Sequence, residues 1–226
     1  QIDRIIPGDV IALSDRRVEL SADYLAGLNE AERGEITLRL SCKSEILHEQ
    51  TFPVRLLARD EWGGVNDMAQ LLPAFVMPND PAIAGVLRNA AERLVAHGLP
   101  SGLDGYQSND PKRAYILTAA IYSAVAKMGI FYAEPPASFE HRGQKVRRPH
   151  TIEHEKLGTC LDTTLLFASA LEASGLHPVV LMFDCHAAVG VWLTPKTFAN
   201  TIETDQMEVR KALASRELIV FETTGV

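Results

Sequence analysis

The stretch LGTCLDTTLLFASALEASG, residues 157–175, decides how we interpret this chain. Thr159 and Asp162 have the spacing of a capping box, in which the threonine is the N-cap and the acid is the third helical residue. A mostly apolar run follows and ends at Gly175, a residue type that commonly terminates helices. The sequence therefore predicts a helix that begins around Cys160.

Cys160 falls in the first turn of this predicted helix. Free backbone N–H groups and the positive end of the helix dipole favour thiolate over thiol there, and the thiolate is the nucleophile. We therefore expect an activated cysteine. The alternative is a small buried residue that packs the start of the helix, which is the commoner role of an arbitrary cysteine.

Two more helices are predicted before this stretch. One runs from Asp80 to Gly98 and the other from Asp110 to Gly129, and in each the aspartate is an N-cap with proline in the first turn. After the stretch, the pattern predicts further elements: strands at 178–183 and 186–193, a polar helix around 207–215 and a last strand at 217–223. Helices followed by adjacent strands are typical of an α+β domain with an antiparallel sheet.

His186 and Glu222 are the other candidate chemical groups. His186 shares a strand face with the small residues Ala188 and Gly190, which leaves space beside its ring. Glu222 stands where the last strand is expected to carry an apolar residue, so it needs a partner. An imidazole N–H donated to this carboxylate would fix the ring tautomer, as in nucleophile–base–acid triads. The alternatives are a structural histidine and a solvated glutamate at a strand end.

Cys185 is expected to point away from His186, as a core thiol, if the strand is already regular there. A zinc site made of Cys160, Cys185 and His186 is then disfavoured, because neighbouring strand residues diverge and the chain has no CxxC pair. We expect no metal and no cofactor.

The N-terminal part has the pattern of short strands. Residues 36–42 alternate in polarity, a polar turn follows at 43–45, and another apolar run covers 52–57. Together with Val18-Glu19-Leu20 upstream, these runs predict a small antiparallel β-sandwich.

This pattern predicts three parts. They are an N-terminal Ig-like β-sandwich at 1–62, a connector at 63–79 that glycine and proline punctuate, and an α+β domain at 80–226.

Composition limits the class of protein. Of 226 residues 46% are hydrophobic and 23% charged, which excludes disordered chains. Acidic residues outnumber basic ones, 29 against 22, so we do not expect direct nucleic-acid binding. No apolar run reaches the roughly 20 residues that cross a bilayer, no export signal opens the chain, and three cysteines suit a reducing compartment. We expect a cytoplasmic protein without membrane partners and, because it begins with Gln1, a piece of a longer one.

Several separated blocks resemble the transglutaminase-like branch of the papain-like cysteine enzymes. That branch has a Gly-x-Cys-x-Asp helix start, a His-Ala-aromatic strand and an Asp-x-Thr strand end. The matching blocks are residues 147–152, 157–162, 165–175, His186-Ala187 and 221–224, and the match as a whole covers roughly residues 110–226. The resemblance implies a transglutaminase-like or papain-like core in which Cys160 is the nucleophile, His186 the general base and Glu222 the orienting acid.

The chain departs from this pattern in three respects, one of which is the gap of 36 residues between His186 and Glu222, longer than usual in compact members. The third member is a glutamate where the family has aspartate, and Ala187-Ala188 follows His186 where an aromatic residue is usual. Papain-like enzymes often use a glutamine as an oxyanion donor, which makes Gln144 a candidate for that role. His150 and His154 are alternative bases.

A closer resemblance is to the transglutaminase-like segment of long bacterial proteins that carry a superfamily-1 helicase motor and often a nuclease-like domain. The phrases at 57–64, 75–79 and 136–140 suggest it. It implies helicase and nuclease domains in the same polypeptide as partners. The run 141–148 carries four cationic side chains, which either steer an acidic ligand or form a solvated loop paired with Glu153 and Glu155.

The sequence thus favours a cysteine-nucleophile acyl-transfer enzyme with a protein or peptide substrate, whose reaction is that of a peptidase, a deamidase or a transglutaminase. The alternative is a catalytically inactive protein-binding module of the same fold within a larger helicase/nuclease protein.

Overall fold

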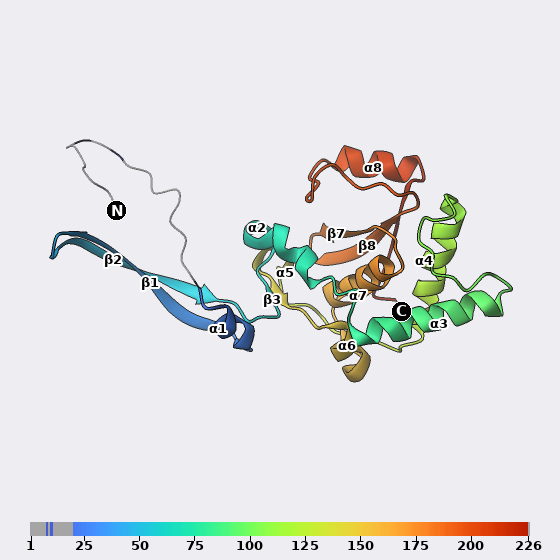
Figure 1. The fold of residues 1–226 in the computed structure, drawn as a ribbon, viewed down its shortest axis with the longest axis horizontal. Helices are drawn as coiled ribbons and strands as arrows, with labels where there is room; N and C mark the ends of the chain where they lie inside the picture. Colours follow the sequence, from blue (N-terminus) through green and yellow to red (C-terminus); the bar gives the residue numbers. More distant parts are fainter. Residues whose placement is uncertain (1–7, 9, 11–19, 226) are drawn as a thin grey trace. The chain divides into compact units, whose positions relative to one another are not determined.

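The computed structural model describes residues 8, 10 and 20–225 and divides the chain into two compact units, residues 1–59 and 60–226 (Figure 1). It is mixed α+β with small, mainly antiparallel sheets, so the expected fold class is confirmed at that level. That the core is transglutaminase-like stays a prediction. Within the described part of the chain, no helix is both long and apolar enough to cross a membrane.

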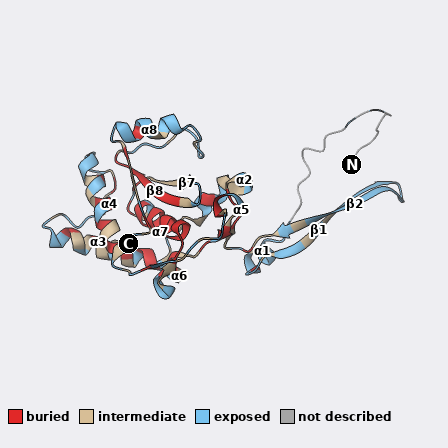
Figure 2. Cartoon of the chain, turned by 180° about the vertical axis from the view of Figure 1, so that it is seen from behind, coloured by how far each residue is buried: buried red, intermediate tan, exposed pale blue. Residues whose placement is uncertain are grey.

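The first unit is built around a long β-hairpin. Helix α1 (Ala22–Gly27) precedes strand β1 (Glu32–Cys42), which pairs antiparallel with β2 (Glu45–Leu56). The described residues of this unit form this one two-stranded sheet and not the two sheets of the expected sandwich, while Val18 and Glu19 lie outside the described residues. The alternating pattern was enough to predict strands, but β2 runs unbroken through the stretch where we expected separate pieces. Most of the hairpin is exposed (Figure 2).

Three predicted helices of the second unit are confirmed: α3 (Pro81–Ala96), α4 (Pro111–Ala126) and α7 (Cys160–Ala173). Asp80 and Asp110 cap α3 and α4 as expected, each accepting a hydrogen bond from a backbone N–H of the first turn. Helix α7 is buried over twelve of its fourteen residues. Figure 2 shows this mostly buried helix at the centre of the unit. It is apolar on almost every side because other elements surround it.

A three-stranded antiparallel sheet packs on α7. Its strands are β7 (Pro178–Phe183), β8 (His186–Trp192) and β9 (Leu218–Phe221), in the order β7-β8-β9, and helix α8 (Gln206–Ala214) precedes β9. Val189 and Val191 of β8 belong to the same hydrophobic cluster as α7, whereas Trp192 packs in a separate cluster with Ala212 of α8. The two faces of the sheet are thus covered by different helices.

The turn between β7 and β8 corrects one expectation. Cys185 has a positive φ of 58° and is exposed, so it is a turn residue and not a core thiol. The strand becomes regular only at His186, which removes the basis for assigning Cys185 to the core.

Short elements complete the second unit. They are β3 (Glu61–Trp62), α2 (Val65–Met68), the 3₁₀ helix η1 (Ala69–Phe75), β4 (Phe131–Tyr132), α5 (Phe139–Arg142), β5 (Gln144–Lys145), α6 (Pro149–Glu155) and β6 (Leu157–Gly158). Strands β3 and β5 pair antiparallel, and β4 and β6 pair parallel.

The stretch that we expected to be a connector folds into the second unit as α2 and η1. Trp62 is fully buried, and its indole N–H donates to the carbonyl of Met68 at 2.8 Å. Beside it the backbone at Gly143 comes very close to the backbone of Trp62. A Cβ on Gly143, whose φ is +80°, would lie 1.7 Å from the carbonyl oxygen of Trp62, so only glycine fits there.

Candidate active site

Strands β8 and β9 bring together an acid and a base. His186 Nε2 lies 2.8 Å from Glu222 Oε2. The other carboxylate oxygen, Oε1, accepts hydrogen bonds from the Thr223 N–H at 2.8 Å, the Thr224 N–H at 2.9 Å and the Thr224 hydroxyl at 2.8 Å. Oε1 is therefore held by Thr223 and Thr224, and Oε2 faces the imidazole. In the neutral ring Nε2 then carries the proton, and the lone pair stays on Nδ1.

The hydrogen bonds also set the charge of Glu222. Partial burial acts to raise the pKa of this carboxyl, but the hydrogen bonds from Thr224, His186 and Thr223 outweigh it and lower the pKa from 4.5 to about 2. Glu222 is thus a carboxylate at any pH at which the protein would work, as an orienting acid must be.

Cys160 is the first residue of α7, and the capping box predicted in front of it is confirmed. Thr159 Oγ1 accepts from the Asp162 N–H at 3.2 Å, and Asp162 Oδ2 accepts from the Thr159 N–H at 2.9 Å. The thiol itself is completely buried, in a hydrophobic cluster with Trp62, Phe139 and other apolar side chains.

Burial changes the expected state of this thiol. It raises the pKa of Cys160, more than hydrogen bonds from the backbone N–H groups of Ala187, Leu161 and Cys160 itself lower it, and the charge of Asp162 raises it further. The expectation of a thiolate favoured by the helix start is therefore wrong for this conformation, because desolvation outweighs the helix start.

The Cys160 thiol contacts the backbone next to His186. One of the three backbone N–H groups that hydrogen-bond to the thiol belongs to Ala187, which follows His186 on β8. Among the described residues the imidazole hydrogen-bonds to Glu222, and no hydrogen bond joins it to the thiol. The structure thus pairs two of the three predicted residues and places the third against the adjoining backbone.

Gln144, the predicted oxyanion donor, is nearly buried beside the start of α7. Its side-chain N–H donates to Thr159 Oγ1 at 2.8 Å, whereas its buried Oε1 has no hydrogen-bond partner among the residues that the structure describes. One amide hydrogen is therefore committed to the N-cap that precedes Cys160. The observed contact is structural, and the oxyanion role stays a prediction.

Asp162 does more than cap the helix. It is fully buried and also accepts from the backbone N–H of Arg147 at 2.8 Å and from its guanidinium at 3.0 Å. Arg147 Nε also lies 3.5 Å from Glu155 Oε2. Glu155 is one of the two acids expected to pair with the 141–148 run if that run is a solvated loop. One cation of the 141–148 run is thus part of the framework that holds the helix start.

Sequence reasoning missed Tyr132. This residue of β4 is 45% exposed and pairs with Gly158, two residues before the candidate nucleophile. Burial of the hydroxyl, then the charges of Cys160 and Glu134, a hydrogen bond with Cys160 and the charge of Glu222 raise the pKa of Tyr132. The phenol hydroxyl therefore interacts with the Cys160 thiol and with the charge of Glu222. No periodicity marked it, because β4 has only two residues.

The alternative bases are placed differently. His150 Nδ1 lies 2.7 Å from Asp80 Oδ2, the carboxylate whose other oxygen caps α3, so this ring ties α6 to α3. His154 is exposed in the last turn of α6. Among the described residues, no group of three His, Cys, Asp or Glu side chains is arranged to hold a metal ion.

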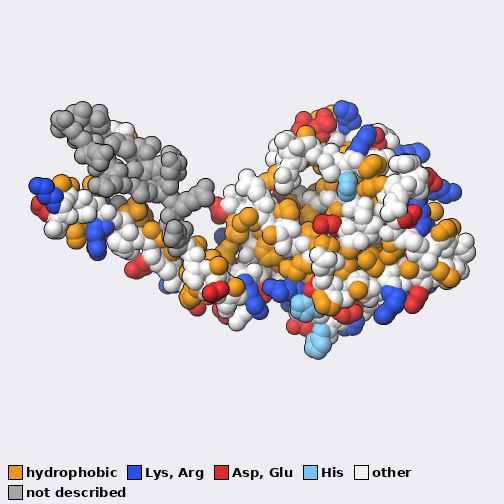
Figure 3. Space-filling view, viewed as in Figure 1, with side chains coloured by type: hydrophobic (Ala, Val, Ile, Leu, Met, Phe, Trp, Pro, Cys, Tyr) orange, Lys and Arg blue, Asp and Glu red, His pale blue; other side chains and the backbone are white. Residues whose placement is uncertain are grey.

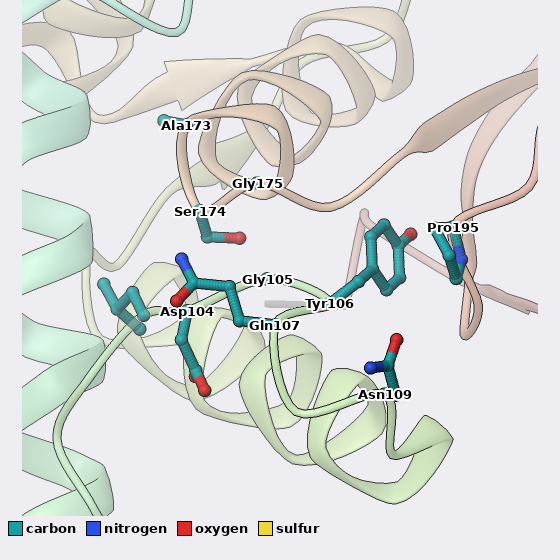
Figure 4. Close-up of a pocket in the computed structure, with 10 residues that line it drawn as sticks. Asp104, Gly105, Tyr106, Gln107, Asn109, Ala173, Ser174, Gly175 and Pro195 are labelled. Atoms are coloured by element: carbon teal, nitrogen blue, oxygen red, sulfur yellow. The ribbon is translucent and has the colours of Figure 1, made fainter.

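A surface hollow of about 580 Å³ lies elsewhere on the second unit, between the loop 103–109 and the end of α7 (Figure 4). Gln107, Asn109 and Ser174 line it with polar groups, and Asp104, which is paired with Arg113, also lines it. None of the predicted catalytic residues lines this hollow, so it does not belong to the Cys160 site.

Comparisons with family models, curated proteins and solved structures give no match to this chain. The functional argument therefore rests on the geometry described above.

Proposed function

We propose that this chain is a cysteine-nucleophile acyl-transfer enzyme that acts on amide bonds of a protein or peptide. The observation that carries the proposal is the bond between His186 and Glu222, with a carboxylate locked in its ionised form by three further hydrogen bonds. Cys160, the first residue of the capped helix α7, accepts a hydrogen bond from the backbone N–H of Ala187, the residue after His186. Nucleophile, base and orienting acid are the parts that such chemistry needs.

The reaction would run in two steps. His186 Nδ1 takes the proton of the Cys160 thiol while Sγ attacks the amide carbonyl, and Nε2–H stays on Glu222 Oε2. The imidazolium then protonates the leaving amine or ammonia as the C–N bond breaks. A water molecule or a second amine, deprotonated by His186, resolves the thioester and returns the thiol. The products are those of a peptidase, a deamidase or a transglutaminase.

The described conformation is closed for this reaction, because Cys160 has no exposed surface. Substrate binding must uncover the thiol and bring the imidazole to it. Catalytic hydrogen bonds that form only in the substrate complex are common among enzymes. The half-exposed Tyr132, whose hydroxyl interacts with the thiol, is the side chain whose movement would open the site.

The same burial favours the second candidate function, a catalytically inactive transglutaminase-fold module that binds a protein partner, such as helicase and nuclease domains of the same polypeptide. A buried thiol with a raised pKa needs no turnover to explain it. The interspersed cationic and anionic side chains on the face in Figure 3 offer nucleic acid no single-sign surface there.

The experiment that separates the two candidates incubates the 226-residue chain with a peptide library and scores cleavage, deamidation and hydroxylamine capture by mass spectrometry. The proposal expects one of these products from the wild-type chain and from Cys185→Ala, the matched control that removes a neighbouring exposed thiol. Cys160→Ala and His186→Ala should give none. Binding without any product, unchanged in Cys160→Ala, would establish the inactive module instead.

A further inference from the structure

A buried group of three threonine hydroxyls joins the nucleophile helix to the acid strand. Thr223 Oγ1 lies 3.0 Å from Thr163 Oγ1 and 3.2 Å from Thr164 Oγ1. All three side chains are at most 2% exposed, so no solvent competes for these bonds. Thr163 is one turn along α7 from Cys160, and Thr223 directly follows Glu222.

The protons of this group can be assigned by counting donors. Thr163 Oγ1 lies 3.1 Å from the carbonyl oxygens of both Thr159 and Cys160, so its single proton goes to these carbonyls. It is then an acceptor for the Thr223 hydroxyl, and Thr223 in turn accepts from Thr164. The three hydroxyls form a directed chain that ends on the backbone of the N-cap and of Cys160 itself.

Thr223 also holds the carboxylate of Glu222 in place. Because the side chain of Thr223 is anchored on α7, its backbone N–H is held where it meets Glu222 Oε1, at 2.8 Å. Thr224 completes the grip on that oxygen, and Oε2 is left for the imidazole. Glu222 itself is half exposed, so packing alone does not hold it in place.

We propose that Thr223 is a positioning residue, which sets the distance and orientation of the His186–Glu222 pair relative to Cys160 through its hydroxyl bonds to Thr163 and Thr164. This inference rests on the proposed function only for its effect on turnover. Its effect on the imidazole can be measured in a chain that turns over nothing.

The test compares Thr223→Val, which deletes the hydroxyl, with Thr223→Ser, which keeps it. Thr118→Val is the matched control, because Thr118 is also buried and its hydroxyl donates to the Ala114 carbonyl at 2.8 Å on α4. In ¹⁵N spectra of the His186 ring, we expect the Nε2–H tautomer in the wild type, Thr223→Ser and Thr118→Val, and a mixture of tautomers in Thr223→Val. With a peptide substrate, kcat of Thr223→Val should fall about 10- to 100-fold, with little change in KM.

A Thr223→Val chain that keeps the Nε2–H tautomer as fully as Thr118→Val does would overturn the inference. So would a loss of the tautomer in both variants alike, because a general loss of packing would then be the cause. A wild-type chain without turnover but with the expected tautomer series would reject the enzyme function and leave the positioning role supported.

Discussion

Glu222→Gln tests whether the carboxylate at the end of β9 is held as the structure describes. The change keeps the size of the side chain and removes its charge. The pKa of Glu222 is lowered in the folded protein, so its charge stabilises the fold above the ordinary value of 4.5. That contribution is lost as pH falls from 4.5 toward about 2.

The magnitude follows from the shift and the exposure. A pKa that falls from 4.5 to about 2 corresponds to an upper bound of roughly 3 kcal/mol. Because 53% of the side chain is exposed, solvent screens the interaction, and we expect about 1 kcal/mol to remain.

The assay is urea unfolding of both chains at about pH 6 and about pH 2.5. The excess stability of the wild type over Glu222→Gln should shrink by about 1 kcal/mol between these two conditions. The control is Glu217→Gln, which removes an exposed ion pair with Lys196 that lowers the pKa of Glu217. The stability difference between the wild type and Glu217→Gln should disappear at high salt. A Glu222→Gln difference that is the same at both pH values would refute the reasoning.

Two substitutions and one labelling experiment test the framework of the site. Asp162→Asn removes the charge of a fully buried carboxylate that pairs with the partly exposed Arg147, and it should lower the free energy of unfolding by about 3 kcal/mol in urea; a loss under about 1 kcal/mol would contradict the network around Asp162. Trp62→Ala should cost about 4 kcal/mol in the same assay, and near-wild-type stability would show that residues 60–79 do not belong to the second unit. Iodoacetamide should modify the exposed Cys42 and Cys185 about tenfold faster or more than the buried Cys160, as mapped by peptide mass spectrometry; equal rates would contradict the closed site.

The elements that sequence could predict are those whose signals are local. Asp80 and Asp110 cap their helices because a side-chain oxygen reaches backbone groups two residues away, which needs no tertiary information. The same holds for the capping box at Thr159 and Asp162. Glu222 could be singled out because a carboxylate in an apolar strand pattern requires a partner, and the structure provides His186.

The state of Cys160 could not be predicted in this way. Its burial comes from Trp62 and Phe139, which are far away in sequence, and desolvation then dominates the local helix-start effect. Tyr132 joins the site through a two-residue strand, too short for any periodicity. Cys185 was misplaced because a left-handed turn residue interrupts the alternation that was assumed to continue.

The expected sandwich differs for another reason. Alternation shows that residues 36–42 form a strand with two unlike faces, but it does not say how many strands share a sheet or whether a second sheet covers it. The described residues supply one partner strand, β2, and leave Leu38, Leu40 and Phe52 exposed.

The close crossing at Gly143 determines where the chain can be cut. The carbonyl of Asp60 accepts a hydrogen bond from the backbone N–H of Val146, and Trp62 pairs with Gln144. The segment 144–146, which lies beside the start of α7, is therefore paired with residues that precede the connector expected at 63–79. A truncated second unit that starts at residue 63 would lack Asp60 and Trp62, which form one side of that crossing. Separate expression of the second unit should therefore begin no later than Asp60.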